Sequence, residues 1–144
     1  MTKRFVLDTS VVVAGMRSPK GASARLLEAA ALDRIVIVVT NALALEYEAV
    51  CLRPEHLTAA GLSGALAREF LDGLINIADP VAVWYKLRPQ LADADDEFVL
   101  EAAVNGGVDA LVTFNMADFT AAGARYGVEV MRPAAALRAM EDEE

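Results

Sequence analysis

Apolar residues come in short blocks along this chain, and the blocks predict alternating strands and helices. Runs rich in β-branched residues at 5–7 and 35–39 are typical of strands that are buried on both faces of a sheet. A third run, at 109–114, follows two glycines. Weaker runs at 81–84 and 128–131 indicate one or two further strands.

Segments with helical spacing separate these runs. The segment at 94–105 opens with acidic residues, which favour a helix N-terminus, and should end at Gly106 or Gly107. Pro133 suits the first position of a final helix. The expected helices cover 21–33, 41–52, 57–78 (as one or two helices), 94–105 and 133–140.

This alternation predicts an α/β fold in three layers, with a parallel sheet of four or five strands flanked by helices. A chain of 144 residues fits a single domain spanning 1–144, ending in the acidic tail 141–144.

Composition points to a cytoplasmic protein. Hydrophobic residues make up 56% of the chain, yet no apolar run approaches the roughly 20 residues that a membrane span needs. The first residues lack the pattern of a secretory signal. The single cysteine, Cys51, cannot form an internal disulfide and is expected to be a small buried apolar residue.

The negative charge is concentrated in the second half. The chain carries a formal net charge of −8. Residues 1–72 are neutral overall, so residues 73–144 account for the whole excess. An acidic protein should avoid nucleic acid unless its carboxylates bind cations.

Acidic residues follow the ends of several predicted strands, and the carboxyl ends of parallel strands share one edge of a sheet. Asp8 ends the first strand, and Glu46 lies just past the second. Asp93, Asp95 and Asp96 open a later helix, where Asp93 and Asp95 could equally be helix caps, and Asn115 and Asp118 follow the strand at 109–114.

Carboxylates that converge must bind protons or cations. Oxygen ligands without histidine or cysteine partners suit Mg²⁺ or Mn²⁺ rather than zinc. The chain has only His56 and Cys51, so a zinc site is not expected, and a Ser-His-Asp or Cys-His arrangement would require His56 as its base.

Four segments together resemble the PIN-domain ribonucleases over residues 4–133. They are "FVLDTSVVVAG", "LEYEAV", "DADDEFVLEAA" and "DALVTFNMADF", in that order. The segment "MRSPKGASARLLEAA" is similar to the branch of VapC-like toxins, one half of toxin–antitoxin pairs. The resemblance implies a PIN-like fold and a metal-dependent endoribonuclease that hydrolyses single-stranded RNA.

The resemblance also implies the site. Asp8, Glu46 and Asp96 match the first three acids of the family, and Asp118 is the candidate for the fourth. Many relatives carry Asp where this chain has Asn115, which puts a second metal ion in doubt. We expect Thr9 or Ser10 to orient Asp8 by a hydrogen bond, and Asp93 to be an additional acid of the site. Thr113 and Asn115 would, together with Asp118, position water or the second metal ion.

The implied partners are RNA, a cognate antitoxin and a second copy of the chain. Arg17 and Lys20 lie in a Gly/Pro-containing loop expected beside Asp8 and are candidates for binding RNA, with Arg53 and Arg88 as weaker ones. The alternative is a catalytically inactive PIN fold that serves as an interaction module.

Two other magnesium-dependent α/β classes fit poorly. A haloacid-dehalogenase-type phosphatase needs D-x-D-x-T after the first strand, where this chain has Ser10 in place of the second Asp. A response-regulator receiver domain would need an acid pair early in the chain and a late lysine, yet no lysine follows Lys86.

Overall fold

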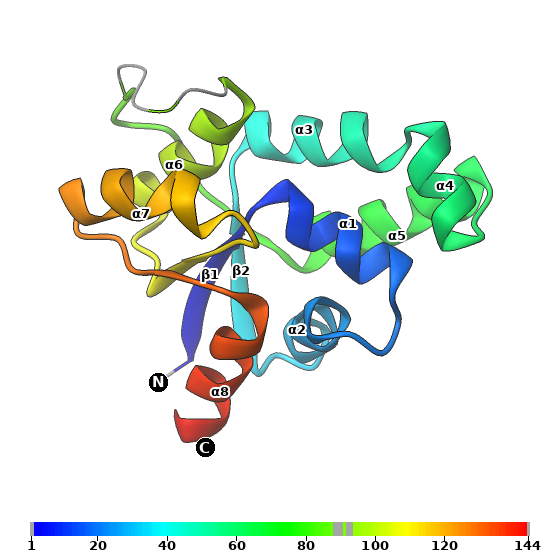
Figure 1. Ribbon diagram of the computed structural model, residues 1–144, viewed down its shortest axis with the longest axis horizontal. Helices are drawn as coiled ribbons and strands as arrows, with labels where there is room; N and C mark the ends of the chain where they lie inside the picture. The colour runs from blue at the N-terminus through cyan, green and yellow to red at the C-terminus, as the bar shows by residue number, and fades with distance from the viewer. Residues whose placement is uncertain (1, 88–90, 92–93, 144) are drawn as a thin grey trace.

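Five parallel strands form one sheet in the order β3-β2-β1-β4-β5. The computed structural model describes residues 2–87, 91 and 94–143 (Figure 1). Its α/β architecture and parallel sheet confirm the fold class predicted above. The strands are β1 (Lys3–Leu7), β2 (Ile35–Val39), β3 (Asp79–Pro80), β4 (Ala110–Val112) and β5 (Val130–Met131).

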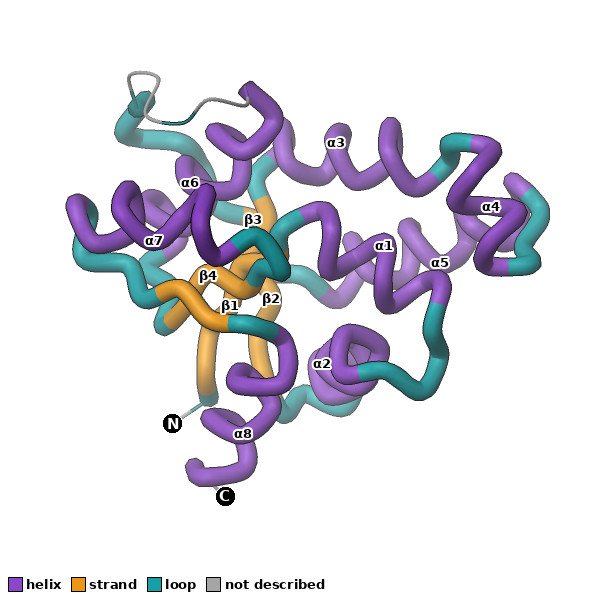
Figure 2. Tube along the Cα trace, viewed as in Figure 1, coloured by secondary structure: helices purple, strands orange, loops and turns teal. Residues whose placement is uncertain are grey.

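Helices cover both faces of the sheet (Figure 2). On one face α6 packs against β1, β2 and β4, and α7 packs against β5. On the other face α1, α2 and α8 contact β1, β2 and β4 respectively. The helices are α1 (Thr9–Arg17), α2 (Ala22–Ala31), α3 (Asn41–Cys51), α4 (Pro54–Ala60), α5 (Gly64–Ile77), α6 (Ala94–Gly106), α7 (Met116–Arg125) and α8 (Pro133–Glu143).

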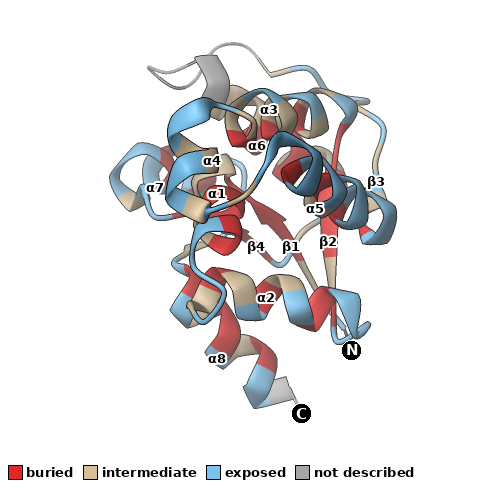
Figure 3. Ribbon diagram, turned by 90° about the vertical axis from the view of Figure 1, so that its right-hand side faces the viewer, coloured by how far each residue is buried: buried red, intermediate tan, exposed pale blue. Residues whose placement is uncertain are grey.

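In the central strands, consecutive residues are buried, so buried and exposed positions do not alternate. Residues 5–7 of β1 and all three residues of β4 are buried, because helices cover them on both sides. Figure 3 shows these strands in red between helices whose outward faces are exposed. None of the helices in the described ranges is long and apolar enough to cross a membrane.

One predicted strand is absent from the structure. Residues 81–84 are not a strand, since β3 pairs with β2 only through Asp79 and Pro80. The N–H groups of Trp84 and Tyr85 donate to the side chain of Asn105 instead of to a neighbouring strand. The segment 57–78, predicted as one or two helices, belongs to two, because Gly61 adopts a left-handed conformation (φ 69°) and Ser63 caps α5.

Two helices, α1 and α7, lie where no helix was predicted. In α1 the residues Val11, Val12 and Val13 look like a continuation of β1 in the sequence. They nevertheless form a helix, since all three are buried there against the rest of the fold. Burial therefore outweighs the strand preference of β-branched residues at this position.

The connections between the strands create a switch point at the carboxyl edge of the sheet. β1 leads into α1 on one face, and its neighbour β4 leads into α7 on the other. In open α/β sheets, ligands bind in the crevice that opens between two such strands. The residues that follow β1 and β4 are therefore the first place to look for a site.

A pair of glycine substitutions tests the packing of α7. A Cβ at Gly123 would lie 2.8 Å from the Val128 carbonyl oxygen and 2.7 Å from Val130 Cγ2. Gly123→Ala should lower the free energy of unfolding by about 1–3 kcal/mol. Gly73→Ala, in the middle of α5 with open space around it, should raise it by about 0.5–1 kcal/mol. Urea titrations measure the free energy of unfolding of both variants. Equal changes in the two variants would contradict the close contact of Gly123 with Val128 and Val130.

Candidate functional site

Asp8 lies at the switch point, between the end of β1 and the start of α1. Its N–H donates to the Val112 carbonyl at 2.8 Å, which extends the pairing of β1 with β4 by one residue. Its own carbonyl accepts from Val11 N–H at 2.9 Å and so begins the helix. The side chain makes no capping bond to α1, which leaves the carboxylate for other contacts.

Two hydroxyl groups hold the Asp8 carboxylate. Ser10 Oγ donates to Oδ2 at 2.7 Å, and Thr113 Oγ1 donates to the same oxygen at 2.8 Å. Asp8 is only 5% exposed, and Thr113 is fully buried. In the described part of the chain, Oδ1 accepts no hydrogen bond. A carboxylate with one oxygen anchored and the other left over is suited to binding a cation.

Asn115 joins this network through its backbone. Its N–H donates to Thr113 Oγ1 at 2.9 Å, so the Thr113 hydroxyl accepts on one side and donates to Asp8 on the other. The Asn115 carbonyl accepts from Asp118 N–H at 3.1 Å, at the start of α7. The loop after β4 is thereby linked to the carboxylate after β1.

The other predicted acids lie on three different helices. Glu46 is half-buried on α3, Asp96 is half-buried near the start of α6, and Asp118 is exposed in the first turn of α7. No three His, Cys, Asp or Glu side chains within the described ranges are grouped so that they could hold a metal ion. Asp93 lies outside the described residues.

Of the supporting residues, Ser10 orients Asp8, whereas Thr9 makes no hydrogen bond to it. The loop with Arg17 and Lys20 is not beside Asp8, and this expectation was wrong. Helix α1 separates them by nine residues, which is about 13 Å of helix. Both side chains are exposed, Arg17 as the last residue of α1 and Lys20 in the turn that follows.

Tyr47 belongs to the site but was not predicted as part of it. It is 1% exposed on α3, next to Glu46, and its hydroxyl donates to the Leu7 carbonyl at 2.5 Å. This bond fixes the last residue of β1 just before Asp8. Burial raises the pKa of Tyr47 well above its ordinary value, and the negative charge of Asp8 raises it further. The sequence could have indicated this role, because a tyrosine on the apolar face of a predicted helix is buried and its hydroxyl then needs a hydrogen-bond partner.

Alkaline pH should destabilise this region. Burial raises the pKa of the Cys51 thiol, one turn beyond Tyr47, from 9.0 to about 12. Between these values the unfolded chain loses the thiol proton and the folded chain keeps it, so stability falls as pH rises above about 9. Urea midpoints from pH 7 to pH 11 should decrease, and Cys51→Ala should decrease less steeply over the same range. Parallel curves for the two proteins would contradict the raised pKa.

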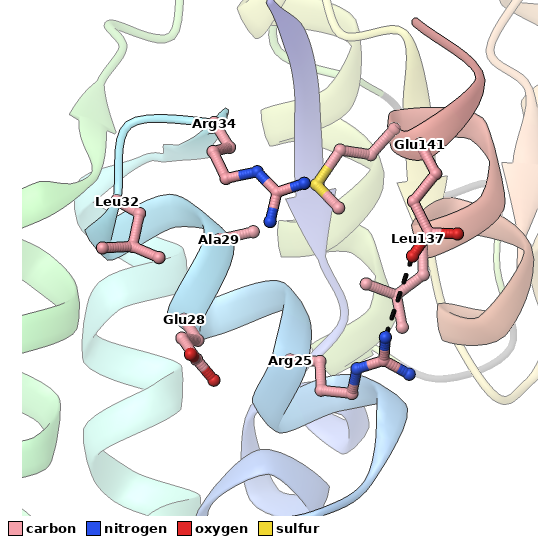
Figure 4. Close-up of a pocket in the computed structure, with 8 residues that line it drawn as sticks. Arg25, Glu28, Ala29, Leu32, Arg34, Leu137 and Glu141 are labelled. Carbon is pink, nitrogen blue, oxygen red and sulfur yellow. Dashed lines mark ion pairs between the residues drawn. The ribbon is translucent and has the colours of Figure 1, made fainter. Parts of the chain in front are cut away.

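A separate cavity lies at the opposite edge of the sheet, between α2 and α8 (Figure 4). It has a volume of about 220 Å³, and Arg34, just before the amino end of β2, is part of its lining. Arg25 and Glu141 pair across it at 3.7 Å. Because ligands of such sheets bind at the carboxyl ends of the strands, this cavity is not the candidate site.

Comparison with known proteins agrees with the geometry. Residues 4–117 match the PIN domain, a family of nucleases that typically use divalent metals. No curated protein matches the chain. The match includes β1 with Asp8, α3 with Glu46, α6 with Asp96, and β4 with Thr113 and Asn115. The chain therefore belongs to the PIN domain family.

Proposed function

We propose that this protein is a metal-dependent endoribonuclease that hydrolyses phosphodiester bonds of single-stranded RNA. The observation that carries the proposal is Asp8, buried at the switch point with Oδ2 held by two hydroxyl groups and Oδ1 left over. The proposal is supported by the match to the PIN family and by the order of Asp8, Glu46 and Asp96 along the chain.

The residues at this edge fit a hard cation. The available donors are carboxylate and hydroxyl oxygens, which suit Mg²⁺ or Mn²⁺. Asp8, Glu46 and Asp96 would hold the ion, with Asp118 as a fourth acid. When bound, Mg²⁺ or Mn²⁺ would supply Lewis-acid chemistry, activating water and offsetting the negative charge that develops on the phosphodiester. Ser10 and Thr113 keep the Asp8 carboxylate in one orientation, and Tyr47 fixes the strand that precedes it.

We further propose that the enzyme is the toxin of a type II toxin–antitoxin pair, with a cognate antitoxin and a homodimeric state. The similarity of "MRSPKGASARLLEAA" to VapC-like toxins supports the toxin role. Arg17 and Lys20, at the far end of α1, remain candidates for contacts to RNA beyond the scissile bond.

The alternative is that the PIN fold is an inactive interaction module. The acids of the described residues are not gathered into a group that could hold an ion. In the nuclease, Glu46 and Asp96 would hold the cation together with Asp8. In the interaction module, no cation binds.

Cleavage of a fluorescent single-stranded RNA panel tests the proposal. We expect cleavage with millimolar Mg²⁺ or Mn²⁺ and its loss on addition of EDTA. Mn²⁺ should also raise the melting temperature, because it binds the folded state preferentially. Superimposable melting curves with and without Mn²⁺, together with no cleavage of any RNA, would leave the interaction module as the function.

A further inference from the structure

Two neighbouring aromatic side chains are left open to solvent between β3 and α6. Trp84 is 82% exposed and Tyr85 is 71% exposed, more than any other large hydrophobic residue that the structure describes. Most aromatic rings of this size are buried, since they carry a large apolar area. Adjacent exposed aromatics therefore call for a ligand that covers them.

The backbone beneath these rings is fixed by one side chain. Asn105 Oδ1 accepts from the N–H groups of Trp84 and Tyr85, both at 2.8 Å. Asn105 Nδ2 donates to the Tyr85 carbonyl and to the Glu101 carbonyl, both at 2.9 Å. Three bonds thus tie the pair to Asn105, near the end of α6. The rings are presented from a fixed support, although residues 81–87 form neither helix nor strand.

A groove of about 600 Å³ lies beside the pair, between the segment 81–86, α3 and α6. Most of its lining is apolar, and Lys86 adds one positive charge. Lys86 makes no ion pair with the described residues. Residues that line the groove include Asn41, Leu45, Val81, Val83, Lys86 and Glu101.

The groove continues the edge on which Asp8 lies. Asn41 lies two residues past the end of β2, at the start of α3. Val81 directly follows β3, and its N–H donates to the Val39 carbonyl at 2.9 Å. In the order β3-β2-β1, these positions are one and two strands away from the end of β1. Strands lie about 5 Å apart, so the groove begins within about 10 Å of the Asp8 strand. Figure 1 shows the segment after β3 running past α6.

We propose that Trp84 and Tyr85 are a stacking platform for the bases of single-stranded RNA, and that the groove leads this strand to the Asp8 site. The proposal rests on the nuclease function proposed above. Aromatic faces stack on any base, and this contact does not require a basic surface. It therefore explains how a chain with a net charge of −8 holds a polyanion. Lys86 faces the phosphates, and the apolar floor faces the bases.

RNA fits this surface better than a protein partner does. The groove beside the platform begins near the edge that carries the candidate catalytic residue, and Lys86, a cation among the described residues that line the groove, complements a phosphate. If stacking dominates, binding should depend weakly on salt. Each phosphate contact of a single strand adds about −0.7 to the slope of log K against log salt concentration, so we expect a slope no steeper than about −2.

Tryptophan fluorescence reports directly on this platform, because Trp84 is the only tryptophan in the chain. The experiment titrates the protein with oligo(U) and oligo(A) in EDTA, so that binding is measured apart from cleavage. We expect fluorescence quenching in the parent. Anisotropy of labelled RNA should show affinity about tenfold lower in Trp84→Ala and near-parent affinity in Trp84→Phe, which keeps a ring. Leu32→Ala, which truncates a side chain 62% exposed at the opposite edge, is the matched control.

The outcomes separate this inference from the proposed function. Absence of quenching, or equal affinities for the parent and Trp84→Ala, would overturn the platform even if RNA is cleaved at Asp8. A change in oligomeric mass in Trp84→Ala without a change in RNA affinity would identify a protein interface instead, and would also overturn it. Quenching and a tenfold loss of affinity without cleavage in Mn²⁺ would support the platform and reject the nuclease.

Discussion

Asp8→Asn should lower the rate of RNA cleavage by more than about 100-fold and leave the protein folded. The substitution removes the negative charge of a proposed metal ligand. Loss of a residue that merely orients a metal ligand costs about 10- to 100-fold, so loss of the ligand itself should cost more. The amide oxygen of Asn can still accept from Ser10 and Thr113, which preserves the contacts that hold the loop in place.

The measurement compares initial cleavage rates of purified parent and variant in Mn²⁺, with melting temperatures taken in EDTA. Asp33→Asn is the matched control, because Asp33 is exposed between α2 and β2, at the opposite edge of the sheet. Its φ of 59° is one that Asn also tolerates. Equal rates in the parent and Asp8→Asn would mean that the cleavage comes from a contaminant or from another site.

The pattern of apolar residues predicted the central strands of the sheet correctly, because these strands are buried on both faces. The run at 35–39 matches β2 residue for residue, and β1 and β4 differ from prediction only at their ends. The pattern failed where tertiary contacts outweigh local preference. Val11–Val13 form a helix because they are buried. Beyond Val81, the N–H groups of Trp84 and Tyr85 donate to the Asn105 side chain instead of to a strand.

The sequence predicted those site residues whose positions are determined by the ends of the strands. Asp8 and Thr113 follow neighbouring parallel strands, so their contact follows from the topology. The role of Tyr47 could not be predicted in this way, because its bond to Leu7 joins a helix to a strand 40 residues away in the sequence. The distance from Asp8 to Arg17 was misjudged for a related reason. Helix α1 occupies the interval between Asp8 and the loop, where no helix was predicted.

Thr113→Val should lower cleavage about 10- to 100-fold, although Thr113 is not proposed to touch the metal or RNA. Val keeps the shape of Thr but removes the hydroxyl that donates to Asp8 Oδ2 and accepts from Asn115 N–H. The carboxylate then loses one of its two orienting bonds, which is the kind of loss that weakens metal sites by this factor. Stability should fall by about 1–3 kcal/mol, since two buried or half-buried polar groups lose their partner.

Thr113→Ser distinguishes positioning from a merely structural role. Ser keeps the hydroxyl and loses a buried methyl group, so it should also destabilise the fold, by about 1 kcal/mol. If Thr113 acts by holding Asp8, the Ser variant should retain near-parent cleavage and Mn²⁺ affinity despite this loss, while the Val variant loses both. Cleavage rates that follow the unfolding free energy across the parent, Ser and Val proteins would instead assign Thr113 to the core alone.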